Sequence, residues 1–142
     1  MIPSGEKRKL VVLDADRRTL HDVCDVAKQW YDVLPTHDVR MAMAWLQNDR
    51  DVSVFVTEQV DHAFEGSSLL EKVRTLHPKV RRIVLTNYSD LSRLIEGLHN
   101  GAIERLVRKP IDRQEFLAAI APSDGHIAAI ATTGTAKIAR SA

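Results

Sequence analysis

The chain has 142 residues, 44% of them hydrophobic and 27% charged, a balance that suits one globular domain with a single core. Its formal net charge of +1 argues against binding nucleic acid or a membrane surface through charge alone. The lone cysteine, Cys24, excludes an intrachain disulfide framework, and no apolar stretch approaches the ~20 residues of a membrane span. With no signal-peptide pattern before the first apolar segment, we expect a cytoplasmic protein.

The first third of the chain alternates strand-like and helix-like segments. The apolar run 10–13 predicts a strand. A helix is predicted next by apolar residues at i, i+3, i+4 and i+7, namely Leu20, Val23, Cys24 and Ala27. Segment 30–34 predicts a second strand and segment 39–46 a second helix. In that second helix we expect Met41, Ala44 and Trp45 to face the core.

The alternation continues through the rest of the chain. Residues 52–57 predict a buried strand that ends at Glu58, and an amphipathic helix is expected to start at Gly66 and stop before Pro78. Residues 83–85 predict a fourth strand, closed by Thr86. Asp112, three residues before Glu115, can form a capping box that opens a fifth helix. The fourth helix is marked by Leu91, Leu94, Ile95 and Leu98.

Continuous apolar strands separated by amphipathic helices indicate a parallel sheet covered on both faces, so the fold class is α/β. In such sheets the functional site lies beyond the carboxyl ends of the strands. Five polar residues fall at or just after these ends and are expected to converge: Asp14, Asp16, Glu58, Thr86 and Lys109. We expect residues 1–121 to form the domain and residues 122–142 to be a flexible tail or the start of a linker.

These anchor residues, in this order, resemble the receiver domain of two-component response regulators over roughly residues 7–121. The resemblance implies a flavodoxin-like, doubly wound sheet of five parallel strands in the order 2-1-3-4-5, with five helices. It also implies a signalling module and not an enzyme. Glu58 stands where the family has a phosphorylatable aspartate, which makes this an atypical member.

The resemblance also implies which residues would hold magnesium. Asp14 matches the first of two acidic residues after the first strand, but Ala15 occupies the second position, which usually binds the metal directly. Asp16 is the alternative ligand, because residues i and i+2 of an extended segment project the same way. A magnesium site, if formed, would therefore consist of Asp14, Asp16 and Glu58, although we expect no cofactor.

The remaining receiver positions are partly retained. Thr86 resembles the threonine that contacts the phosphoryl oxygen, and Lys109 resembles the lysine that pairs with the acceptor carboxylate. The resemblance implies a cis peptide before Pro110. Leu106 occupies the family's aromatic switch position, where an aliphatic side chain cannot serve as a rotating ring.

Glu58 allows three interpretations. Its carboxylate lies about one methylene farther from the backbone than that of aspartate, so attack geometry tuned within ~1 Å would suffer. It is a structural partner of Lys109 in an inactive scaffold, a built-in mimic of the phosphorylated state, or a residual phosphoacceptor. Thr57 would take the acceptor position after a one-residue shift and Asp61 lies in the following loop, but the spacing from Glu58 to Gly66 favours Glu58.

An interaction face is suggested by four arginines in the region of the fourth helix, the fifth strand and the fifth helix: Arg93, Arg105, Arg108 and Arg113. We expect a protein partner, an output domain or a homodimer there, with no direct nucleic-acid or membrane contact. The last-strand segment 100–110 is similar to receivers that precede phosphodiesterase or transcriptional activator domains. Six scattered histidines with one cysteine do not form a zinc pattern.

The leading function hypothesis is a pseudo-receiver that acts through protein interaction without phosphorylation. The alternatives are a phosphoacceptor receiver that uses Mg²⁺, and an unrelated flavodoxin-like domain that binds a small anion near Thr86 and Lys109.

Overall fold

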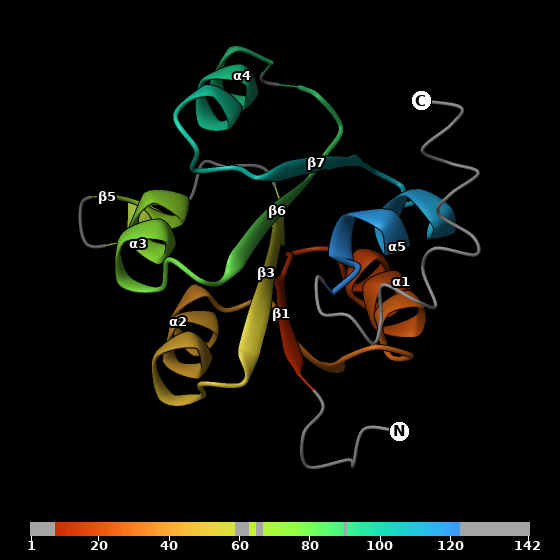
Figure 1. Ribbon diagram of the computed structural model, residues 1–142. Coiled ribbons are helices and arrows are strands. Elements are labelled where there is room, and N and C mark those ends of the chain that lie inside the picture. The colour runs from red at the N-terminus through yellow and green to blue at the C-terminus, as the bar shows by residue number, and fades with distance from the viewer. Residues whose placement is uncertain (1–7, 59–62, 65–66, 90, 123–142) are drawn as a thin grey trace.

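Five parallel strands form one sheet in the order β2-β1-β3-β6-β7 (Figure 1). The computed structural model describes residues 8–58, 63–64, 67–89 and 91–122. The predicted fold class and strand order are therefore confirmed. The strands are β1 (Lys9–Leu13), β2 (Asp32–Thr36), β3 (Val52–Glu58), β6 (Arg81–Thr86) and β7 (Arg105–Arg108).

Five helices cover the two faces of this sheet. Figure 1 shows α1 and α5 on one face and α2, α3 and α4 on the other. Together with the sheet they make the three layers expected of a doubly wound fold. The helices are α1 (Arg17–Ala27), α2 (Val39–Asn48), α3 (Leu69–Leu76), α4 (Leu91–His99) and α5 (Arg113–Ile120).

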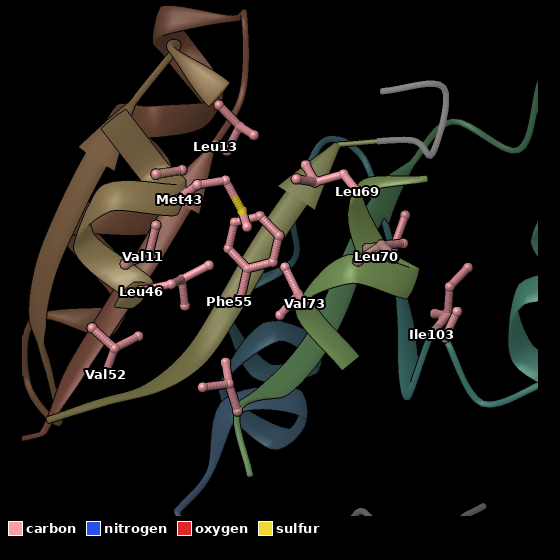
Figure 2. Close-up of a cluster of buried hydrophobic side chains, with 14 of the residues drawn as sticks. Val11, Leu13, Met43, Leu46, Val52, Phe55, Leu69, Leu70, Val73 and Ile103 are labelled. Carbon is pink, nitrogen blue, oxygen red and sulfur yellow. The ribbon is translucent and has the colours of Figure 1, made fainter. Parts of the chain in front are cut away.

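The core consists of two clusters, one on each face, because successive strand residues point to opposite sides. In β1, Leu10 and Val12 pack under α1 and α5, whereas Val11 and Leu13 pack under α2 and α3. Figure 2 shows the second cluster, with Phe55 of β3 at its centre. Strands buried on both faces explain why the apolar runs in the sequence are continuous and not alternating.

Among the described residues, four helices begin at a side chain that accepts a backbone N–H of the first turn. Asp16 caps α1, Asp38 caps α2, Ser68 caps α3 and Asp112 caps α5. One of the two hydrogen bonds of the predicted capping box is present, since Asp112 Oδ2 accepts the Glu115 N–H at 2.9 Å. These caps satisfy otherwise unpaired N–H groups and fix where each helix leaves the edge of the sheet.

Two predicted boundaries were wrong. The second strand spans residues 32–36, not 30–34, and it includes Pro35. This is tolerated because β2 is an edge strand, where a missing N–H donor disrupts pairing least. The third helix begins at Leu69 and not at Gly66, because Ser68 supplies its cap; Gly66 lies outside the described residues. Ala63–Phe64 (β4) pairs with Ser67–Ser68 (β5) in a short antiparallel ladder that the sequence did not predict.

The predicted core face of α2 was wrong for two of its three residues. Met41 and Ala44 are exposed, whereas Trp45 is half-buried and packs against the core, as predicted. The buried residues are instead Ala42, Met43 and Leu46. Nearly every residue from 39 to 46 is apolar, so periodicity fits two adjacent stripes equally well, and only packing against β1 chose between them.

Helix α4 contacts the domain through a narrow strip. Within α4 only Leu94 and Gly97 are buried, although the helix has four leucine or isoleucine residues. A Cβ at Gly97 would lie 2.5 Å from Ile103 Cδ1, so the missing side chain allows close approach. The rest of its apolar stripe faces solvent.

The other helix predictions held more closely. In α1, Val23 and Ala27 are buried while Leu20 and Cys24 are half-buried.

The predicted tail, residues 122–142, lies outside the described residues except for Pro122. Among the described residues, no helix has the length and hydropathy needed to cross a bilayer.

A buried guanidinium fixes the turn between α4 and β7. Arg82 is 6% exposed and donates to the carbonyls of Val80, Gly101 and Ala102 at 2.8, 3.3 and 3.1 Å. It also lies 3.3 Å from the carboxylate of Glu104. The planar fork of arginine suits several acceptors at once.

We expect Arg82→Met to lower the free energy of unfolding by about 2–4 kcal/mol, because buried carbonyls and a carboxylate lose their donor. Arg82→Lys should recover little of this, since an ammonium cannot span the same acceptors. Urea denaturation measures both, with the exposed Arg40→Met as control. A loss below ~1 kcal/mol in Arg82→Met would contradict this role.

Candidate functional site

The predicted site residues lie at one edge of the sheet. Asp14 follows β1, Glu58 ends β3, Thr86 ends β6 and Lys109 follows β7. Adjacent strands are in register at this edge, with Leu13 beside Thr57, Glu58 beside Leu85 and Thr86 beside Arg108. Parallel pairing therefore brings together residues that are up to 95 positions apart.

Asp14 is the buried centre of the site. Its side chain is 0% exposed, and the Lys109 ammonium lies 3.0 Å from Oδ2 and 3.3 Å from Oδ1. Oδ1 also accepts the Asp16 backbone N–H at 2.8 Å, whereas Oδ2 accepts no hydrogen bond from the described residues. Burial raises the pKa of Asp14 above its ordinary value, while the Asp16 N–H and Lys109 oppose the rise. The negative charge of Glu58 adds to it.

Glu58 is turned towards the backbone and not chiefly towards Lys109. Its Oε2 accepts the Ala15 N–H at 2.9 Å, and its Oε1 lies 3.9 Å from the Lys109 ammonium. The predicted pairing with Lys109 is thus present but secondary, because Lys109 is closer to Asp14. The longer side chain lets Glu58 bridge from β3 to the segment after β1.

The Asp16 carboxylate is hydrogen-bonded to the first turn of α1, the helix that it precedes. One carboxylate oxygen accepts the Arg18 N–H at 3.1 Å and the other accepts the Thr19 hydroxyl at 2.9 Å. The Thr19 hydroxyl, followed by the Arg18 N–H, lowers the pKa of Asp16. Its carboxylate serves as the N-cap of α1, a role that its position before the helix could have indicated.

Thr86 and Lys109 lie at the same edge of the sheet and are also joined by a backbone hydrogen bond. The Lys109 N–H donates to the Thr86 carbonyl at 2.8 Å, and the peptide between Lys109 and Pro110 is cis, as the resemblance implied. The buried Thr86 hydroxyl accepts the Tyr88 N–H at 2.8 Å. Tyr88 has a φ of 64°, uncommon for a residue other than glycine.

The remaining candidate positions lie around this cluster. Leu106 is half-buried and packs against the core beneath α2 to α4. Thr57, the alternative acceptor, is 1% exposed, and its hydroxyl has no hydrogen-bond partner among the described residues. Asp61 lies outside the described residues.

The four arginines of the predicted interaction face are exposed, but they do not form one group. Arg105 and Arg108 lie on the edge strand β7, and Arg113 opens α5. Arg93 is on α4, two residues after Leu91, and so about 200° around the helix from it.

A divalent metal needs several hard oxygen ligands that are free to turn towards it. Among residues 8–58, 63–64, 67–89 and 91–122, no three His, Cys, Asp or Glu side chains are placed to hold a metal ion. Asp16 caps its helix, Glu58 accepts the Ala15 N–H and Asp14 is paired with Lys109. The donor set as arranged does not fit the magnesium that the receiver pattern implies.

Solved structures of receiver domains superpose on this chain. The signal receiver domain of an HD domain-containing protein from Pseudomonas fluorescens Pf-5 superposes with a TM-score of 0.69 at 23% identity, over 84% of this chain and 88% of that one. A CheY-like receiver domain protein from Methanospirillum hungatei JF-1 gives a TM-score of 0.66 at 20% identity, covering 80% and 90%. This chain has the receiver-domain fold.

The receiver fold is also present in a protein of different description. An adenylate cyclase from Rhodopirellula baltica gives a TM-score of 0.70 at 18% identity, over 96% of this chain and 99% of that one. Searches of protein-family models and of curated proteins give no match. At these identities the similarity establishes the receiver fold and leaves function to the site residues.

Sequence reasoning found the five edge residues of this receiver fold but missed two features. The Ala15 N–H, which binds Glu58, is a backbone group with no sequence signal. The exposed stripe of α4 was visible as a pattern, but nothing in the sequence indicated that it lies outside the core.

We expect Lys109→Met to destabilise the protein by about 2–4 kcal/mol near pH 7, because buried Asp14 loses its counter-ion. A raised folded-state pKa means that ionised Asp14 costs stability; this cost is absent below about pH 4, the unfolded value, and complete above the folded pKa. Removing Lys109 raises that pKa further, so the difference from wild type should shrink as pH falls towards 4.

Urea denaturation at several pH values measures this difference. The double variant Asp14→Asn/Lys109→Met removes both charges and should recover most of the loss at pH 7. A pH-independent loss, or no recovery in the double variant, would show that Lys109 stabilises the fold by packing and not by charge.

Proposed function

We propose that this chain is an atypical receiver module that acts by protein interaction without being phosphorylated. The observation that carries this proposal is the engagement of Glu58, whose carboxylate accepts the Ala15 N–H at 2.9 Å. A nucleophile must approach the phosphoryl group within about 3–3.5 Å in an aligned geometry. A glutamate already hydrogen-bonded to the neighbouring loop is poorly arranged for that attack.

The other site residues support the same proposal. Phosphoryl transfer depends on a metal and on cations that neutralise developing charge. Here the Lys109 ammonium is closest to Asp14, and Ala15 offers no side-chain oxygen where the receiver pattern has a second acid. Glu58, Asp14 and Lys109 form a self-paired network that needs neither magnesium nor phosphate.

The module would be read by a protein partner or by an output domain, as in signalling proteins that contain receivers. One of the similar structures is the receiver of an HD domain-containing protein, which supports a link to an output domain. In this proposal the chain is not an enzyme, and its surfaces carry the signal.

We expect no gain of mass when the protein is incubated with magnesium and acetyl phosphate, because Glu58 is misplaced for attack. Intact-mass spectrometry measures this beside a standard receiver that serves as positive control. A gain of one phosphoryl group with the wild-type protein would overturn the proposal and favour the phosphoacceptor alternative.

We expect Ala15→Asp/Glu58→Asp to gain one phosphoryl group in the same assay. The first change supplies a metal ligand, and the second restores the shorter acceptor. Each single variant is a control and should gain less than the pair. Magnesium titration with the double variant should show binding that the wild type lacks. If the folded double variant takes up neither ligand, the account of a receiver site altered at these two positions is wrong.

A further inference from the structure

A small pocket lies between the first turns of α1 and the segment that joins β7 to α5. Its volume is about 220 Å³, and its lining includes Arg18 and Asp22 of α1 and Pro110 and Ile111 of the joining segment. Figure 1 shows α1 and α5 side by side on one face of the sheet. Sites for drug-sized ligands enclose about 300–1,000 Å³, so this space suits a smaller molecule. We name it the α1 pocket.

Three other polar residues of the α1 pocket already have partners within the protein. The Asp16 carboxylate accepts the Arg18 N–H and the Thr19 hydroxyl at 3.1 and 2.9 Å. The Lys109 ammonium lies 3.0 Å from the Asp14 carboxylate. A ligand gains little from these groups, because it would have to displace an existing contact.

Arg18 and Asp22 differ from these residues in having no such contact. Among the described residues, neither side chain forms an ion pair, with the other or with a third residue. Asp22 is half-buried, and a charge that is partly withdrawn from water gains more from a partner than a fully exposed one. The two residues are four apart in α1, so their Cβ atoms lie about 5–6 Å from each other on one face of the helix.

This pair of unlike charges selects the chemistry of the ligand. An anion alone leaves Asp22 without a partner, and a cation alone leaves Arg18 without one. In an α-amino acid the ammonium and the carboxylate are joined by a single carbon, so two neighbouring side chains of one helix face can pair with both groups. Pro110 and Ile111 present hydrocarbon, which favours an aliphatic side chain over a polar one.

We propose that the α1 pocket binds a small aliphatic α-amino acid. Its carboxylate pairs with the Arg18 guanidinium, which suits two parallel hydrogen bonds, and its ammonium pairs with the Asp22 carboxylate. Its side chain packs against Pro110 and Ile111. This inference goes beyond the proposed function, because it gives a small-molecule ligand to a chain that is proposed to act through protein contacts.

Isothermal titration calorimetry of the full chain with L-leucine, L-valine and L-isoleucine tests the proposal. We expect saturable binding of at least one of them. The matching carboxylic acid without the amino group, and the matching amine without the carboxylate, should each bind at least tenfold more weakly, because one charged contact is lost. L-Serine should also bind more weakly, since it cannot use the hydrocarbon wall. These comparisons need only the wild-type protein.

Variants of the two charged residues locate the ligand. Arg18→Met and Asp22→Asn should each weaken binding at least tenfold for the same reason. Arg17→Met and Asp25→Asn change exposed charges of α1 that are not part of the pocket lining, so they are the matched controls and should leave affinity unchanged. Circular dichroism checks that each variant is folded.

The results that would overturn the proposal differ in what they replace. Absence of saturable binding for all three amino acids would remove the ligand site. Equal affinity for the carboxylic acid without the amino group would replace the zwitterion with an anion, and equal affinity for L-serine would remove the aliphatic requirement. Binding that is unchanged in folded Arg18→Met and Asp22→Asn would place the ligand elsewhere.

The outcome is separable from that of the proposed function. Intact mass after incubation with magnesium and acetyl phosphate is measured on the same protein. A gain of one phosphoryl group would overturn phosphorylation-independent action and leave the α1 pocket in place. Unmodified protein that binds none of the three amino acids would overturn the α1 pocket alone.

Discussion

The ion pair between Asp14 and Lys109 is the constraint on which the rest of the site depends. A fully buried carboxylate at the end of β1 requires a positive charge nearby, and the segment after β7 supplies it at 3.0 Å. This pairing draws Lys109 towards Asp14, so Glu58 lies farther from the ammonium and instead accepts a backbone N–H. The ion pair between Asp14 and Lys109 therefore also determines which groups Glu58 contacts.

A site that transfers a phosphoryl group and a site that only stabilises the fold can use the same residues. They differ in whether those side chains are already hydrogen-bonded to other groups of the protein. Phosphoryl chemistry needs oxygen ligands and a cation that can turn towards an incoming group. In this chain most of the candidate oxygens already have a donor: Asp14 Oδ1 accepts the Asp16 N–H and the Lys109 ammonium, and Asp16 accepts from the first turn of α1. Fold similarity to receivers consequently says less about activity than these hydrogen bonds do.

The segment that leads into helix α4 links Thr86, at the edge of the sheet, to the exposed apolar residues of that helix. The Thr86 hydroxyl accepts the Tyr88 N–H, and Tyr88 begins the apolar row that continues along α4. The helix contacts the core through Leu94 and the close approach of Gly97 to Ile103. Because only this narrow strip contacts the core, most of the apolar side chains of α4 are exposed.

The sequence by itself determined the alternation of strands and helices, the strand order through its resemblance, and the edge positions of Asp14, Glu58, Thr86 and Lys109. These follow from local apolar periodicity and from the rule that parallel strands end at one edge. Only the tertiary structure decided which stripe of α2 is buried, where Asp16 and Glu58 find their donors, and that Leu91, Ile95 and Leu98 are exposed. The physical reason is that periodicity identifies an apolar face, whereas the competition among neighbouring elements for space and for hydrogen bonds decides what covers it.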